Sequence, residues 1–197
     1  YYGFIEDPLV AGYVNRLGRS IAAVSRRADI PYEFYVVDTD EVNAFAAPGG
    51  FVFVTRGLLE ETETEEELAG VIAHEVGHVS AMHGAKRIKK LPFIIIGMTM
   101  LESKAGESAA RYAGLALSLM QLHYSREDEY EADRLGASYA ALAGYDPEGM
   151  VSFFRKLERK SPTGNLNRLE IAISSHPRTT SRMARINETP ALADSAE

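Results

Sequence analysis

Apolar side chains at the start of the chain recur every three to four residues. From Leu9 to Val24 they mark one face of a helix. The preceding pair Asp7-Pro8 is typical of a helix start, because Asp caps free N–H groups and Pro suits the first helical position. We therefore expect an amphipathic helix that ends near Asp29.

Aromatic and β-branched runs follow this helix at residues 32–38, 42–46 and 51–55. Each run is short and bounded by turn residues, as strands usually are. The Gly49-Gly50 connection favours an antiparallel hairpin between the second and third runs. These patterns predict a small antiparallel sheet of about three strands.

The rest of the sequence has mainly helical patterns. Thr64 and Glu67 form a capping box ahead of a helix that should extend to about Gly84. The predicted fold class is therefore α+β and mostly helical. Further helices are expected at residues 107–144 (as one long helix or two), at residues 146–160, and after His176-Pro177.

The composition is that of one compact domain. Of the 197 residues, 46% are apolar and 25% charged, enough for a core within a single domain at residues 1–188, followed by a disordered tail at 189–197.

The net charge of -7 argues against a nucleic-acid partner. Because cysteine is absent, any metal ligands must be His, Asp or Glu. The chain begins with Tyr1 and shows no apolar signal core, so we expect a targeting segment to be missing from it.

Two histidines at helical spacing provide the clearest chemical signal. His74 and His78 lie four residues apart, so both imidazoles can reach one tetrahedral zinc ion, while Glu75 is turned aside toward a zinc-bound water. A catalytic zinc needs a third protein ligand. Gly84 stands where a metzincin carries its third histidine, which excludes that class. His83 is expected to face away from the metal.

An acidic segment further along the chain offers the third ligand. Glu129 and Asp133 lie four residues apart on a predicted helix. One carboxylate can therefore bind zinc while the other accepts a hydrogen bond from the far nitrogen of a ligating histidine. Glu127 and Glu131 are rival ligands, and a solvated acidic helix face is the alternative interpretation.

Four motifs follow one another along the chain: Asn43-Ala44-Phe45-Ala46, His74-Glu75-x-x-His78-Val79, Ser125-Arg126-x-x-Glu129-x-x-Ala132-Asp133 and Ser175-His176-Pro177. In this order they resemble the M48 peptidase family, which includes CAAX prenyl proteases, HtpX-like membrane proteases and periplasmic relatives of the BepA type. The resemblance covers most of residues 32–186. It implies a zincin-like (gluzincin) fold, one zinc ion per chain, Glu129 as third ligand and Asp133 as the residue behind a ligating histidine.

The implied activity is that of a zinc metalloendopeptidase of the EC 3.4.24 type. Zinc lowers the pKa of its bound water to about 7, and Glu75 would take that proton and deliver it to the leaving amine. By resemblance, His176 either assists catalysis at the tetrahedral intermediate or binds zinc as a fourth ligand that holds the enzyme inactive. Asn43, Ala44 and Phe45 are expected to bind substrate along an edge strand.

The apolar stretch at residues 91–101 is about half of the ~20 residues that cross a bilayer as a helix. Three interpretations of residues 91–122 stay open: a buried core helix, a lid over the cleft, or a membrane-surface contact. The last would involve residues 86–101, because a basic cluster precedes the apolar stretch. That cluster consists of Lys86, Arg87, Lys89 and Lys90.

The expected partner is a protein or peptide substrate. The resemblance implies hydrolysis of misfolded or exported proteins in the periplasm or cell envelope. The main alternative is a latent or non-proteolytic, chaperone-like domain that binds zinc, but Glu75 argues against it, because a structural zinc site needs no base. A metal-free helical interaction module is a further alternative. The substrate's identity and the oligomeric state are left open.

Overall fold

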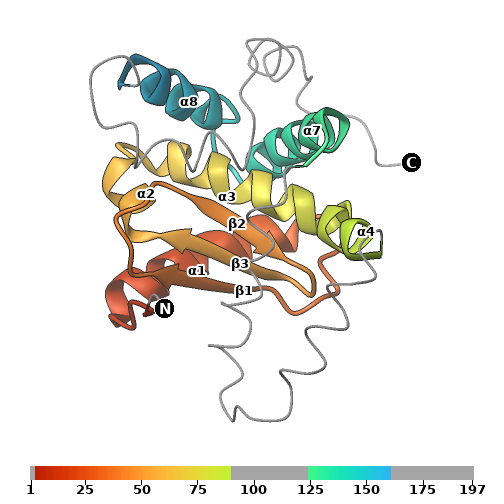
Figure 1. Ribbon diagram of the computed structural model, residues 1–197, viewed down its shortest axis with the longest axis horizontal. Coiled ribbons are helices and arrows are strands. Elements are labelled where there is room, and N and C mark those ends of the chain that lie inside the picture. The colour runs from red at the N-terminus through yellow and green to blue at the C-terminus, as the bar shows by residue number, and fades with distance from the viewer. Residues whose placement is uncertain (1–2, 90–123, 161–197) are drawn as a thin grey trace.

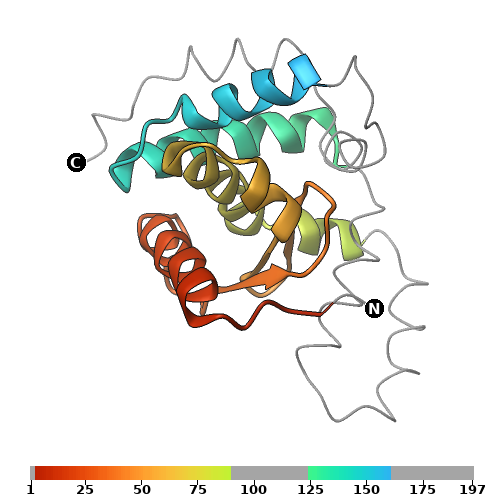
Figure 2. The same cartoon turned by 90° about the vertical axis from the view of Figure 1, so that its left-hand side faces the viewer.

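The computed structural model describes residues 3–89 and 124–160. Figures 1 and 2 show three layers: the sheet with α1, then α3, then α7 and α8 on the far side of α3. The elements in chain order are α1 (Pro8–Ala23), β1 (Glu33–Val37), β2 (Ala44–Ala47), β3 (Phe51–Thr55), α2 (Arg56–Glu61), α3 (Glu65–Ser80), α4 (His83–Lys89), α7 (Arg126–Leu142) and α8 (Gly149–Lys160).

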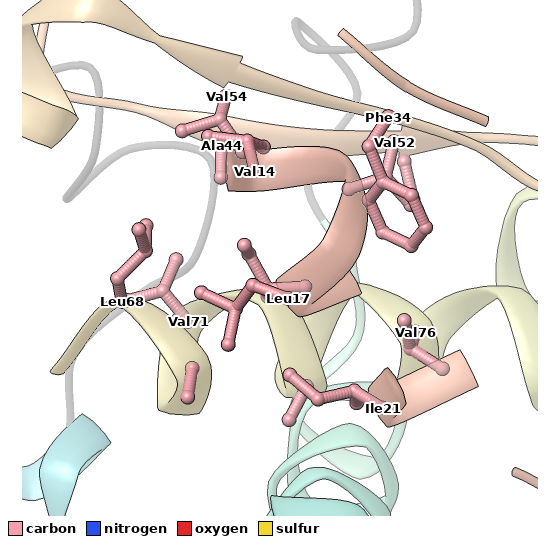
Figure 3. Close-up of a cluster of buried hydrophobic side chains, with 14 of the residues drawn as sticks. Val14, Leu17, Ile21, Phe34, Ala44, Val52, Val54, Leu68, Val71 and Val76 are labelled. Carbon is pink, nitrogen blue, oxygen red and sulfur yellow. The ribbon is translucent and has the colours of Figure 1, made fainter. Parts of the chain in front are cut away.

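The first helix begins where the sequence predicted. The Leu9 N–H donates to the Asp7 carboxylate at 2.8 Å, and Pro8 is the first helical residue. The helix ends at Ala23, earlier than expected, and turns follow. Its apolar face packs against the sheet and against α3, so that α1, the sheet and α3 share one hydrophobic core. Figure 3 shows side chains from all three meeting there, including Val14, Leu17, Ile21, Phe34, Val52, Val54, Leu68, Val71 and Val76.

The sheet has the strand order β1-β3-β2 and is mixed. The predicted hairpin is confirmed: β2 and β3 are antiparallel, and Gly49 and Gly50 connect them with φ of 103° and 100°, a conformation that glycine adopts without strain. The prediction of a wholly antiparallel sheet is wrong, because β1 runs parallel to β3. Residues 38–43 do not join β1 to an adjacent antiparallel strand; they carry the chain past β3 to the opposite edge of the sheet.

Arg56 holds this crossing segment in place. Its guanidinium pairs with Asp38 at 2.8 Å and also with Asp40. The Gly57 N–H donates to the Thr39 carbonyl at 3.0 Å. These contacts attach residues 38–40 to the start of α2, so β2 becomes the edge strand nearest to α3.

The helix predicted to extend from Thr64 to about Gly84 is in fact two helices. Thr64 caps α3 as expected, by accepting from the Glu67 N–H at 3.2 Å, but the Glu67 carboxylate accepts from the Glu63 N–H at 2.9 Å and does not complete the predicted capping box. The helix ends at Ser80, because Met82 adopts a left-handed conformation with φ of 58°, and α4 begins directly afterwards. Residues 67–80 of α3 are all buried, so this helix is enclosed on every side.

The described part of the acidic helix is α7. Ser125 and Asp128 form a capping box at its start. The helix predicted from Asp146 begins slightly later, at Gly149, after a turn in which the Glu148 N–H donates to Asp146 at 2.9 Å. None of the described helices is long and apolar enough to span a bilayer. Residues 107–123, the helix expected after Pro177 and the tail at 189–197 lie outside the described residues.

Candidate metal centre

His74 and His78 lie on one face of α3, as their spacing predicted. Their Nε2 atoms are 3.0 Å apart, and both residues are buried. Because neutral imidazole carries a lone pair on one nitrogen, two Nε2 atoms directed at the same point are suited to sharing a cation.

The helix α7 brings a carboxylate to the same point. Glu129 places Oε2 3.6 Å from Nε2 of His74 and Oε1 3.5 Å from Nε2 of His78. Among the residues that the structure describes, only His74, His78 and Glu129 form a buried set of three potential metal ligands, with their ligand atoms within 4.8 Å of one another. The rivals Glu127 and Glu131 are not in this set, and Glu127 is exposed.

Two glycines allow the helices to approach this closely. A Cβ atom on Gly136 of α7 would lie 2.8 Å from the backbone nitrogen of His74. A Cβ atom on Gly77 of α3 would lie 2.8 Å from the carbonyl oxygen of Ala132. Real Cβ contacts are longer than this. The glycines therefore set the helix separation that lets Glu129 reach the histidines.

Asp133 lies behind the first histidine, one turn along α7 from Glu129. Its Oδ1 is 3.0 Å from Nδ1 of His74, and both side chains are buried. A carboxylate beside Nδ1 favours the tautomer with the proton on that nitrogen, which leaves Nε2 free to bind a metal. The role of Asp133 in supporting a ligating histidine stays a prediction, for which this contact provides the required proximity.

His83 does not face away from the site, so that expectation is wrong. Its Nδ1 lies 3.0 Å from Nδ1 of His78, and its Nε2 lies 3.3 Å from Oε2 of Glu131. The expectation assumed one continuous helix, whereas the left-handed Met82 turns the chain back toward His78. Burial lowers the pKa of His83, against the opposing influence of Glu131 and Asp128, and so favours neutral imidazole.

Tyr124 is a residue that sequence analysis did not single out. Its ring stacks on the imidazole of His78, with centroids 4.0 Å apart and planes inclined by 24°. The Arg87 guanidinium lies over the same Tyr124 ring, 4.7 Å from its centre. Burial raises the pKa of Tyr124, and the negative charge of Glu75 raises it further, so the phenol keeps its proton.

The predicted general base, Glu75, is buried: it is 1% exposed and follows His74 directly on α3. Its negative charge helps to raise the pKa of Tyr124, whose ring stacks on His78. The predicted substrate-binding residues Asn43, Ala44 and Phe45 are also buried. The ring of Phe45 stacks on Phe53 at 4.9 Å, so this side chain contributes to a core on the sheet.

Two predictions concern residues that the structure does not describe. His176 lies outside the described residues. So do residues 90–101 of the candidate membrane contact and residues 91–122 of the core, lid or membrane segment. Of the basic cluster, Lys86 is exposed, whereas Arg87 is partly buried against Tyr124.

Comparison with known families agrees with this arrangement. A family model described as peptidase family M48 matches residues 8–190. The chain belongs to peptidase family M48. M48 membership implies a metal cofactor, and the buried set His74, His78 and Glu129 has the donor chemistry to hold one.

Individual relatives of this M48 chain are larger proteins. The beta-barrel assembly-enhancing protease of Yersinia pestis is 34% identical over 169 residues, which cover 80% of this chain and 34% of that protein. The protein of the same name from Escherichia coli strain K12 is 30% identical over 190 residues, 91% of this chain and 39% of that protein. The mitochondrial metalloendopeptidase OMA1 of Schizosaccharomyces pombe is 30% identical over 177 residues, 89% of this chain and 52% of that protein. The chain thus spans about a third to a half of the length of these curated relatives.

Proposed function

We propose that this M48 chain is a zinc-dependent endopeptidase in which His74, His78 and Glu129 hold one zinc ion. The observation that carries the proposal is the spacing of the potential ligand atoms: the two Nε2 atoms are 3.0 Å apart, and the Glu129 carboxylate places one oxygen 3.6 Å from Nε2 of His74 and the other 3.5 Å from Nε2 of His78. Ligand atoms at normal zinc distances in a tetrahedral site are about 3.3–3.5 Å apart. Two histidines and one glutamate form a ligand set of catalytic zinc sites, which leave a fourth position open.

A zinc ion held by these three residues would supply a Lewis acid for the scissile carbonyl and would make a water molecule nucleophilic near neutral pH. Glu75 acts as general base: it accepts the proton of the attacking water and returns it to the leaving amine. Its burial on α3 keeps this carboxylate in a site of low dielectric, where its interaction with charge is strong. Asp133 holds the tautomer of His74 that presents Nε2 as a ligand.

The substrate is proposed to be a misfolded or exported protein. The edge strand β2 begins with Ala44 and Phe45, and Asn43 directly precedes it; this edge is suited to adding a peptide as a further strand through backbone hydrogen bonds. Because these side chains are buried, recognition there would depend on the backbone. The names of the relatives support a site of action in the cell envelope, and the periplasm is our proposed address.

His176 is proposed to act at the same centre, either by stabilising the tetrahedral intermediate or by occupying the fourth zinc position in a latent form. The support is the resemblance of Ser175-His176-Pro177 to the corresponding M48 motif. The two roles predict opposite effects of His176→Ala: a slower reaction for a helper and a faster one for a latch.

The test combines zinc analysis with proteolysis of an unfolded protein such as casein. We expect about one zinc per chain in the parent and in Glu75→Gln, whereas Glu75→Gln should lower kcat by about 10²–10⁴-fold, since it removes a general base. Glu127→Gln is the matched control, because it changes an exposed glutamate on α7, and it should retain full activity. Absence of zinc from the parent would refute the proposal. Zinc without cleavage in any variant would favour the latent, chaperone-like alternative.

A further inference from the structure

We propose that His83 is a positioning residue for His78, which it holds in the tautomer and orientation that present Nε2 to the metal. The inference rests on the proposed metal centre and assigns a function to a histidine outside the ligand set. Its basis is the 3.0 Å contact between the Nδ1 atoms of the two imidazoles.

The protons in this contact can be assigned from the chemistry of imidazole. At 3.0 Å one Nδ1 must donate and the other must accept. His78 needs the lone pair of Nε2 for the metal, so its single proton is on Nδ1 and donates to Nδ1 of His83. His83 then carries its own proton on Nε2.

The far side of His83 is lined with acceptors for that proton. Nε2 lies 3.3 Å from Oε2 of Glu131 and 3.4 Å from Oδ1 of Asp128. Glu131 in turn pairs with Arg26 at 3.3 Å. The two carboxylates stabilise the proton on Nε2 of His83 and so keep its Nδ1 available as an acceptor. Glu131, considered from sequence as a rival ligand, acts here as the support of His83.

The imidazole of His78 is thereby constrained from two directions. His83 binds its Nδ1 edge, and Tyr124 covers one ring face at a centroid distance of 4.0 Å. His83 itself is 2% exposed, and its contact with His78 is buried and so shielded from water. His83 thus stands to His78 as Asp133 stands to His74: each contacts the Nδ1 atom of a proposed ligand, His83 through an imidazole nitrogen and Asp133 through a carboxylate oxygen.

The experiment compares His83→Phe with His83→Asn in the full chain. Phenylalanine fills the buried space without an acceptor, whereas the asparagine amide oxygen can accept from Nδ1 of His78. Zinc dissociation constants are measured by competition with a chelator, and the visible spectrum of the cobalt-substituted protein reports on ligand geometry. We expect zinc affinity to fall by about 10–100-fold for His83→Phe, the range seen when the partner of a metal-bound histidine is removed. His83→Asn should stay within about fivefold of the parent and retain its cobalt spectrum.

Two results would overturn the inference. One is parent-like zinc affinity in His83→Phe. The other is an equal loss of zinc affinity in His83→Phe and His83→Asn. That result would mean that the hydrogen-bond acceptor of the asparagine makes no difference and that His83 contributes only packing. Thermal unfolding of the zinc-free proteins shows whether either variant is misfolded. A parent without zinc would instead refute the metal centre, and with it this inference, so that failure is recognisable before any variant is measured.

Discussion

The helix α3 carries two buried polar clusters that differ in how their charge is balanced. Near its start, the Glu67 carboxylate meets the Lys156 ammonium of α8 at 2.5 Å and also accepts from the Glu63 N–H at 2.9 Å and the Ser152 hydroxyl at 3.1 Å. About two turns later, His74 and His78 converge with Glu129, so that three acceptor atoms lie within 4.8 Å of one another. The chain supplies the cation of the first cluster itself, whereas the second has the geometry to take its cation from solution.

This contrast explains why one cluster is structural and the other is suited to chemistry. A buried carboxylate bonded to Lys156, Ser152 and a backbone N–H is fully engaged and holds α8 against α3. A site built from acceptors and a nearby base can bind a metal that keeps an open position for a substrate. The two clusters should therefore respond differently to mutation.

The largest expected effect comes from breaking the first cluster. Lys156→Met removes the cation and leaves Glu67, which is 4% exposed, as a buried charge without its Lys partner. We expect the free energy of unfolding to fall by about 3–5 kcal/mol. Zinc affinity should change little, since seven helical residues, about 10 Å, separate Glu67 from His74. Chemical denaturation and chelator competition measure the two quantities.

Arg155→Met is the control for this prediction, because it removes an exposed cation next to Lys156 on the same helix. It should alter stability by no more than about 0.5 kcal/mol. In the double variant Glu67→Gln/Lys156→Met, part of the lost stability should return, since no buried charge is left. Equal losses for Lys156→Met and Arg155→Met would show that the pair is not structural.

A smaller effect is expected from separating the helices at the second cluster. Gly136→Ala places a Cβ atom 2.8 Å from the backbone of His74, so α7 must shift away from α3. We expect a loss of about 2–3 kcal/mol in stability together with weaker zinc binding. Gly12→Ala is the control, because its Cβ would meet only the end of Arg16, at 3.4 Å, and alanine favours the helix by about 1 kcal/mol. Unchanged zinc affinity in Gly136→Ala would mean that helix separation does not control the site.

These glycines also show what the sequence could predict and what it could not. Local spacing was enough to place His74 and His78 on one helix face and Glu129 with Asp133 on another. The close crossing at Gly77 and Gly136 depends on a contact between distant segments, so periodicity does not reveal it. His83 was misplaced for a related reason: no glycine or proline lies between Ser80 and His83 to signal that the helix ends there, and a methionine such as Met82 seldom adopts a left-handed conformation.

The sheet gives a similar lesson. The Gly49-Gly50 turn predicted the hairpin of β2 and β3 correctly, because a tight turn is encoded locally. The parallel pairing of β1 with β3 depends on the crossing of residues 38–43, which Arg56 stabilises from further along the chain. Tyr124 was missed because its stacking on His78 joins two segments that are far apart in the sequence.

Within the second cluster, Asp133→Asn should weaken zinc binding by about 10–100-fold, equivalent to about 1.4–2.7 kcal/mol, while the zinc-free protein keeps most of its stability. The amide can still contact Nδ1 of His74 but lacks the charge that favours the proton there. Chelator competition and thermal unfolding without zinc separate the two effects. A large loss of stability without zinc, and none in zinc affinity, would assign Asp133 to the structural group with Glu67.

The smallest expected effect is the pH dependence of the first cluster. Burial alone would raise the pKa of Glu67, but the hydrogen bond from the Glu63 N–H and the Lys156 ammonium outweigh it, so the pKa lies below its ordinary value of 4.5. A carboxylate with a lowered pKa in the folded state stabilises the protein above its unfolded pKa, and this contribution is lost as pH falls through the folded value. Stability measured by denaturation should therefore fall more steeply below about pH 4.5 in the parent than in Glu67→Gln, since glutamine does not titrate. Parallel curves for the two proteins would mean that the charge of Glu67 adds nothing to the pair, and the contrast between the two clusters of α3 would then rest on packing alone.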